Sequence, residues 1–226
     1  MSKQPQIMGI ERRTIAKDCE VRMIGDDEEG VGEGVSKAGS QISGVAAVFG
    51  SIYDMGWFTE EIAPGALDGA DMSEVVALFN HDTNIPLARN SAGTLTLKID
   101  AQNFAYSFSP PNSPNGENIL EAIRRGDVKQ SSWGFSIDLN GDIWEKRNGK
   151  DHRTITKVAK VWDVSPVTFP ANAETNVVED SLRARRDAFL NEIELPEQTT
   201  SATIDINLFN KRLRLVDANT NSIYTR

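Results

Sequence analysis

The chain has 226 residues, of which 39% are hydrophobic, 7% aromatic and 25% charged. It is therefore too apolar for a disordered chain and too polar for a membrane protein, and its apolar runs are far shorter than the roughly 18 residues of a membrane-spanning helix. Twenty-four basic residues against 33 acidic ones give a net charge of −9 at pH 7, and this negative field disfavours binding to nucleic-acid phosphates.

Cysteine and histidine are scarce, which limits the available chemistry. Cys19 is the single cysteine, so no disulfide can form within the chain, as suits a reducing cytosol. His81 and His152 are the two histidines, and no further ligands are spaced to close a metal site around either. We expect no metal and no cofactor. No basic amino-terminal region precedes an apolar signal core, so we also expect no secretion.

Residues 1–40 form a polar amino-terminal region. The stretch from Ile10 to Met23 is able to add a strand to a core. The acidic run Asp26–Glu29 and the glycine-rich run Gly30–Gly34 then oppose compaction. We therefore expect a strand followed by a flexible acidic loop ahead of the main domain.

Residues 41–177 consist mostly of predicted strands and turns, and we expect them to form the main domain. Residues 42–49 are a strand, and 75–79 are apolar on both faces, as in the centre of a sheet. Apolar residues alternate with polar ones over 95–99 and again over 104–108, which predicts a hairpin.

The second half of this region predicts further strands separated by tight turns. Residues 131–139 are a strand that ends at Asn140-Gly141, and a second turn, Asn148-Gly149, precedes an extended run over 154–164. Asn-Gly adopts positive φ at little steric cost, which is why it marks tight hairpins.

Helices are predicted over residues 66–72, 116–125 and 178–195, before a tail at 196–226 that is either flexible or removed by self-cleavage. In the second helix an acidic first turn, basic residues at the carboxyl end and Gly126 agree with the helix dipole and with a glycine stop. Many strands with few helices predict a mainly β fold with surrounding helices, of the α+β class, as a barrel or a sandwich.

Ser132 is a candidate nucleophile because of its position on the strand over 131–139. Ser131, Trp133 and Phe135 share one face, which is mostly bulky and apolar and should pack inward. Ser132 and Gly134 share the other face, where we expect the serine to be open and the glycine to let a second backbone approach. On this strand alone, an ordinary surface serine is the simpler interpretation.

His81 and Asp163 are candidates for the groups that would activate a serine. His81 follows the apolar strand over 75–79, where a histidine can act as a general base or bond a carbonyl structurally. Asp163 shares a face with Ala159 and Val161, so we expect it to be partly buried and to need a partner such as a histidine N–H. His152 follows a turn among charged residues, so we expect it to be solvated and inert.

Other catalytic motifs are absent from the sequence. Gln130 occupies the first glycine position of a Gly-x-Ser-x-Gly elbow around Ser132. The chain has no His-Glu-x-x-His motif and no phosphate-binding Gly-x-x-x-x-Gly-Lys motif. Cys19 lies among polar residues without an activating pattern, which argues against a cysteine nucleophile.

Five phrases in chain order resemble motifs of the prohead maturation proteases of tailed bacteriophages. They are residues 43–50 for "G-x-A-x-x-F", 60–67 for "E-x-I-x-P-G-A-F", 80–89 for "N-H-D … P-L-G-R", 132–135 for "S-x-G-F", and 162–172 for "E-V-S-x-V … P-A-N". The chain departs from these motifs at Ala88, where the family has glycine, and at Asp163, where it has glutamate. Each of these five segments alone is weak evidence for the family, but their occurrence in the family's order is specific.

The resemblance implies a serine endopeptidase with a β-barrel like that of the herpesvirus assembly proteases, ringed by helices. Ser132 would be the nucleophile and His81 the general base and acid. Asp163 would orient His81, although it is shorter than the family's glutamate. The resemblance and the strand alternation select Ser132 over Ser131 independently.

The family's substrates and location follow from the same resemblance. It implies cleavage of the scaffold segment of the major capsid protein, and of the protease itself, inside the assembling prohead in the host cell cytoplasm. We expect no nucleic-acid or membrane partner and leave self-association open. Residues beyond about Leu195 would serve encapsidation and be dispensable for catalysis.

Three other functions are compatible with the sequence. The first is a catalytically inactive capsid assembly or scaffolding module with the same barrel. The second is a small barrel that binds single-stranded nucleic acid, against which the acidic balance argues. The third is another serine hydrolase, such as an esterase.

Overall fold

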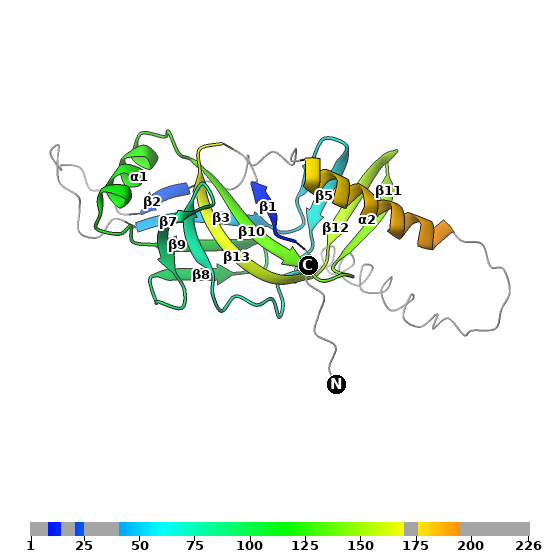
Figure 1. Ribbon diagram of the computed structural model, residues 1–226, viewed down its shortest axis with the longest axis horizontal. Helices are drawn as coiled ribbons and strands as arrows, with labels where there is room; N and C mark the ends of the chain where they lie inside the picture. The colour runs from blue at the N-terminus through cyan, green and yellow to red at the C-terminus, as the bar shows by residue number, and fades with distance from the viewer. Residues whose placement is uncertain (1–8, 15–20, 25–40, 170–175, 195–226) are drawn as a thin grey trace, which may run out of the picture. The chain divides into compact units, whose positions relative to one another are not determined.

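A computed structural model describes residues 9–14, 21–24, 41–169 and 176–194 of the chain. The chain divides into two compact units, Met1–Ile193 and Glu194–Arg226, and the fold described below belongs to the first. Strands dominate the described residues and two helices accompany them, so the predicted mainly β, α+β class is confirmed (Figure 1).

A five-stranded sheet carries the candidate catalytic residues. Its strands, in spatial order, are β1 (Glu11–Thr14), β10 (Gln130–Ile137), β13 (Val158–Val167), β6 (Val76–Phe79) and β7 (Asp82–Arg89). The β10 strand pairs antiparallel with both β1 and β13, and β13 pairs parallel with β6. The apolar stretch before His81 therefore lies inside the sheet, as predicted for a run that is apolar on both faces.

Two four-stranded sheets complete the fold. One contains β11 (Asp142–Arg147), β12 (Lys150–Ile155), β5 (Phe58–Ile62) and β4 (Ile52–Asp54), in that order. The other contains β2 (Val21–Ile24), β3 (Gln41–Val48), β9 (Asn103–Phe108) and β8 (Leu95–Ile99).

The hairpin predicted over 95–108 and the turn predicted at Asn148-Gly149 are confirmed. Asn140-Gly141 does not form a hairpin, because the strands on its two sides, β10 and β11, belong to different sheets. The β8 and β9 strands pair antiparallel across residues 100–102. Asn148 and Gly149 adopt φ values of 52° and 80° and join β11 to β12, which is the mirror-image turn that Asn-Gly favours. The extended run predicted over 154–164 is divided at residues 156–157 between β12 and β13.

The amino-terminal stretch supplies two short strands instead of one. The β1 strand joins the five-stranded sheet beside β10, whereas β2 pairs with β3 in a different sheet. The acidic and glycine-rich loop, Cys19 and the tail lie outside the described residues.

The main core lies between the five-stranded sheet and the sheet that contains β3 and β9. Aliphatic and aromatic side chains fill it, and Trp133, Phe135 and Phe104 are fully buried there. Burial of each such side chain contributes about 1.5–3 kcal/mol. This packing fixes the face of β10 that points inward.

Capping and packing contacts account for the positions of the two helices. In α1 (Pro114–Arg124) the Ser113 hydroxyl accepts the Gly116 N–H, and Ile119, Leu120 and Ile123 join the main core. In α2 (Asn176–Glu194) Leu182 packs with Phe58 and Trp144 in a second, smaller cluster. The predicted positions of both helices are therefore correct to within two residues at each end.

The helix predicted over 66–72 is wrong. Residues 64–69 form consecutive turns whose N–H groups bond carbonyls three residues back, as in the bond from Ala66 to Ala63. Gly65 and Gly69 have φ values of 80° and 78°, and this left-handed backbone interrupts a right-handed helix.

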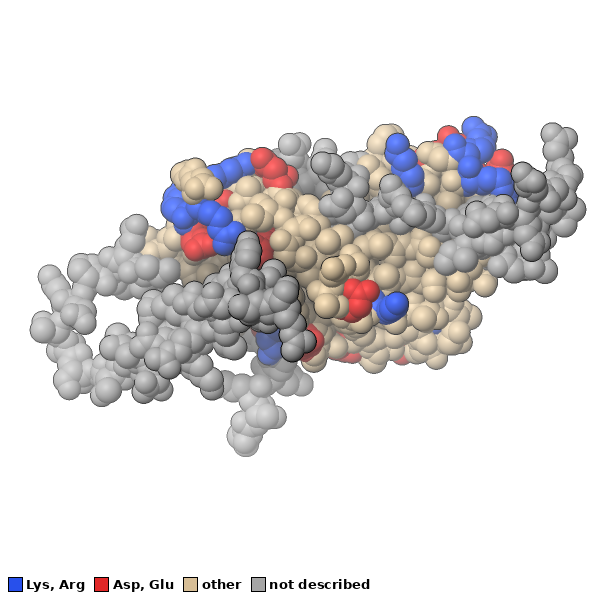
Figure 2. All heavy atoms as spheres, turned by 180° about the vertical axis from the view of Figure 1, so that it is seen from behind, with Lys and Arg blue, Asp and Glu red and all other residues tan. Residues whose placement is uncertain are grey.

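The barrel remains a prediction. Among the described strands, hydrogen bonds connect three separate sheets and do not close a ring. Charged side chains on the face in Figure 2 lie in small mixed groups, in keeping with exposed pairs such as Arg124–Glu121 at 2.7 Å. Neither of the described helices is long and apolar enough to cross a membrane.

Candidate active site

The strand alternation predicted around Ser132 is present in β10. Trp133 and Phe135 point into the core, and the Ser131 hydroxyl donates to the Tyr106 hydroxyl on that side at 3.1 Å. Ser132 lies on the opposite face, directly across from Ser165 of β13. The two neighbouring serines are therefore in different environments, as the pattern indicated.

Ser132 is not open to solvent, however, and that part of the prediction is wrong. The residue has 0% exposed surface. Strand β1 runs along the edge of β10 with Thr14 opposite Ser132, and the Arg13 carbonyl accepts a hydrogen bond from Ser132 Oγ at 3.0 Å. A strand distant in sequence thus pairs with the edge of β10, and its main chain engages the Ser132 hydroxyl.

His81 lies in the turn between β6 and β7. Asn80 and His81 have φ values of 52° and 58°, which is an uncommon conformation for residues other than glycine. The turn is held against the end of β13, because the Asn80 N–H donates to the Pro166 carbonyl at 3.0 Å and Asn80 Oδ1 accepts the Thr168 N–H at 2.9 Å. These bonds offset the backbone strain and place the imidazole over the sheet.

Asp163 reaches His81 because Gly134 leaves room for it. The two residues pair across β13 and β10, and a Cβ added at Gly134 would overlap Asp163 Oδ2. We expected Gly134 to let a backbone approach, but the space holds this carboxylate instead. Asp163 is almost fully buried, as predicted, and its Oδ1 lies 2.5 Å from His81 Nδ1.

The three side chains form a continuous hydrogen-bonded series. His81 Nε2 lies 2.6 Å from Ser132 Oγ, and His81 Nδ1 lies 2.5 Å from Asp163 Oδ1. A carboxylate oxygen can only accept, so Nδ1 carries the proton and Nε2 is free to accept from the serine. A hydroxyl whose proton can pass to an oriented imidazole is able to act as a nucleophile.

Ser165 also belongs to this site, although the sequence analysis gave it no function. Its hydroxyl is fully buried, donates to Asp163 Oδ1 at 2.8 Å and lies 3.3 Å from His81 Nδ1. It stands two residues after Asp163 on the same strand, so alternation puts both on one face. This two-residue spacing is the feature of the sequence that could have predicted the contact between Ser165 and Asp163.

A buried ion network beside the site was also missed. Its members link β1 to β5, β11, β12 and α2, and they are Glu11, Arg13, Glu60, Asp142, Arg153 and Arg185. Three arginines oppose three carboxylates, so the network is neutral, which a buried cluster requires. The feature of the sequence that could have predicted the network is the spacing of Glu11 and Arg13, which places both on one face of a strand and Arg12 on the other.

The network sets the ionisation of Glu11 and Arg153. Burial alone would raise the pKa of Glu11, but Arg153 and Arg13 outweigh it and lower that pKa to about 2. Arg153 is fully buried, and the carboxylates around it hold its pKa well above the usual value despite burial. Glu11, Arg13 and Arg153 therefore stay charged at neutral pH.

His152 is not solvated, so that expectation is wrong. It is fully buried on β12, where its Nδ1 lies 2.7 Å from Thr59 Oγ1, and burial lowers its pKa. The charged neighbours indicated an exposed turn, but the parallel partner strand β5 covers it. The structure does not bring His152 to Ser132. Within the described part of the chain, no group of three or more His, Cys, Asp or Glu residues is arranged to hold a metal ion.

Comparison with known proteins identifies a family that the chain resembles. A family model described as caudovirus prohead serine protease matches residues 29–188, which is more than half of the chain and includes Ser132, His81 and Asp163. Neither a curated protein nor a solved structure matches the chain.

Proposed function

The chain belongs to the family of caudovirus prohead serine proteases, and from this premise we propose that it cuts the scaffold segment of the major capsid protein, and itself, with Ser132 as nucleophile. Membership makes the chain a serine peptidase of phage capsid maturation. The observation that carries the assignment of residues is the Ser132–His81–Asp163 series, with successive contacts of 2.6 and 2.5 Å.

The proposed reaction has two halves. Ser132 Oγ attacks the peptide carbonyl carbon while its proton passes to His81 Nε2, and the imidazolium then gives that proton to the departing amine. Water next adds to the acyl-serine, with His81 as base, and releases the carboxylic acid. General base catalysis of this kind contributes about two to four orders of magnitude in rate.

Asp163 and Ser165 would support the base. The Asp163 carboxylate keeps the proton on Nδ1 and stabilises the positive charge that His81 acquires. Ser165 donates to the same carboxylate oxygen and restrains its rotation. Although Asp163 is shorter than the glutamate of the resembling motif, its 2.5 Å contact supports the same role.

The test compares two neighbouring serines. The chain would be co-expressed with its major capsid protein, and the capsid protein's mass would be measured. We expect the wild type and Ser131→Ala to shorten the capsid protein and Ser132→Ala and His81→Ala to leave it uncut. Ser131 is the matched control because it is equally buried on the opposite face of β10.

An uncut capsid protein with the wild type as well would favour the inactive assembly module instead. Cleavage by Ser132→Ala at the wild-type rate would refute the assignment of the nucleophile. We place the reaction inside the assembling prohead, in the host cytoplasm, because the substrate is gathered there.

A further inference from the structure

Strand β1 occupies the free edge of the strand that carries Ser132. The opposite edge of β10 is bonded to β13, so β1 takes the edge that remains. The pairing is antiparallel, with Thr14 opposite Ser132 and Arg12 opposite Gly134. Extended peptides commonly bind proteins by adding a strand to such an edge. The position of β1 is therefore the one that a bound peptide would take.

The main chain of β1 also engages the hydroxyl of Ser132. That hydroxyl has one proton, which it donates either to the Arg13 carbonyl at 3.0 Å or to His81 Nε2 at 2.6 Å. The serine has no exposed surface. A substrate carbonyl must approach the nucleophile to roughly 3–3.5 Å, and it cannot do so while the Arg13 carbonyl fills that position.

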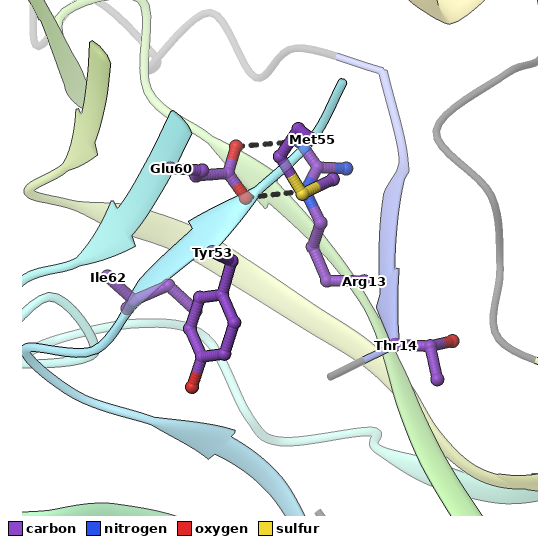
Figure 3. A pocket seen from close by; sticks show the side chains of 6 residues that line it. All are labelled: Arg13, Thr14, Tyr53, Met55, Glu60 and Ile62. Atoms are coloured by element: carbon purple, nitrogen blue, oxygen red, sulfur yellow. Dashed lines mark hydrogen bonds and ion pairs between the residues drawn. The ribbon is translucent and has the colours of Figure 1, made fainter. Parts of the chain in front are cut away.

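The Arg13 side chain lines a small hollow beside the site. The hollow is lined by Arg13, Thr14, Tyr53, Met55, Glu60 and Ile62 (Figure 3). Arg13 Nε contacts Glu60 Oε1 at 2.5 Å and Nη2 contacts Oε2 at 2.9 Å, a two-pronged pairing that matches the guanidinium fork. Arg153 reaches Oε2 of Glu60 at 2.9 Å, whereas Oε1 of Glu60 accepts from Arg13.

Glu11 marks a second position along the same strand. Its carboxylate accepts from Arg153 Nη1 at 2.6 Å and Nη2 at 2.8 Å. Arg12, between Glu11 and Arg13, points to solvent. An extended peptide on this edge would therefore meet the Glu60 carboxylate at one position and the Arg153 guanidinium two residues earlier. The side chain of the residue between them would point to solvent.

We propose that β1 occupies the substrate edge of the active site and that peptides bind there in its place as an extended Glu-x-Arg segment. The arginine side chain binds Glu60, its carbonyl faces Ser132, and the acidic residue binds Arg153. Glu60 is the specificity-determining residue, and β1 keeps the site closed until a peptide displaces it. This inference rests on the proposed function and adds its substrate class and its regulation.

The first experiment uses the unaltered full chain. The probe is acetyl-Ile-Glu-Arg-Arg diphenyl phosphonate, which copies residues 10–13. Ser132 Oγ would form a bond to phosphorus as one phenol leaves with the proton. Mass spectrometry would locate the adduct, and hydrogen exchange would follow the amides of β1. We expect the adduct on Ser132 together with loss of protection in β1. An adduct with β1 still protected would overturn the proposal.

The second experiment tests Glu60. The same probe with glutamine in place of its last arginine should modify the wild type at least about tenfold more slowly, because it lacks the charged pair. In Glu60→Gln the two probes should react within about threefold of each other. Equal rates in the wild type would overturn the assignment of Glu60.

A third experiment separates this inference from the proposed function. A small alkyl fluorophosphonate without a peptide should label Ser132 at least about tenfold faster in Arg13→Ala than in the wild type. Arg12→Ala is the matched control, since its side chain points to solvent, and should label at the wild-type rate. No labelling of any variant would refute the proposed function. Labelling at equal rates in all three would refute only the closure by β1.

Discussion

Replacement of Asp163 by asparagine removes the negative charge from the site while preserving its shape. Ser165 and His81 both bond the same oxygen, Asp163 Oδ1, and an asparagine carbonyl oxygen can accept both bonds. The amide nitrogen would then stand over Gly134, where Oδ2 stands now. The tautomer of His81 is therefore kept, and the change tests the electrostatic role of the carboxylate alone.

The expected loss follows from the charge pair. The His81 and Asp163 side chains are 10% and 7% exposed, so solvent screens them poorly. A carboxylate and an imidazolium roughly 4 Å apart interact by about 4 kcal/mol at an effective dielectric constant of about 20. At about 1.4 kcal/mol for each factor of ten, kcat should fall about a thousandfold. An amide turned the other way would favour the wrong tautomer, with a loss nearer 10⁴.

The assay is steady-state cleavage of a peptide that spans the capsid cleavage junction. Asp163→Asn should lower kcat with little change in KM, and its thermal unfolding should confirm that the fold is intact. Asp151→Asn is the control, because Asp151 is similarly buried but lies on β12, where it pairs with Lys146 and Arg186. A loss in kcat smaller than tenfold for Asp163→Asn would refute the proposed role of this carboxylate.

Two further predictions concern stability and packing. Glu11 has a pKa lowered from 4.5 to about 2, so its stabilising contribution is fully present above pH 4.5 and is lost as the pH falls toward 2. In urea unfolding at pH 7, Glu11→Gln should have a free energy of unfolding about 3 kcal/mol below that of the wild type. Near pH 2 the two free energies should be equal, and a difference that stays constant down to pH 2 would contradict the prediction. Gly134→Ala should lower kcat by at least about tenfold and destabilise the fold by about 1–3 kcal/mol, because the added methyl group displaces Asp163. Gly9→Ala, where a Cβ meets nothing within 4 Å, is its control in activity and melting measurements, and unchanged kcat in Gly134→Ala would show that the carboxylate is not displaced.

Local patterns in the sequence were sufficient for much of the fold. Strict alternation predicted the β8–β9 hairpin, and Asn148-Gly149 predicted the turn between β11 and β12. The charges and the glycine stop of α1 predicted its position because helix ends depend on residues within one turn. Alternation also distinguished Ser132 from Ser131, since a core face and its opposite differ at successive residues.

Contacts between distant segments were not predictable in the same way. The helix expected over 66–72 does not form, since two glycines take left-handed backbone there. His152 was expected in solvent because its chain neighbours are charged, yet a parallel strand from residues 58–62 covers it. Composition of a segment describes its own surface and carries no information about which strand will lie beside it.

By itself, the sequence determined the class of fold, the order of the motifs, and the three side chains proposed for catalysis. The tertiary structure alone decided that the Asp163 carboxylate fits over Gly134 and that five buried charges and the partly buried Arg185 compensate one another. It also decided that the main chain of β1 bonds the Ser132 hydroxyl. These features depend on strand register between residues as far apart as 13 and 132. Register is set by the packing of the whole core, so no local stretch of sequence contains it.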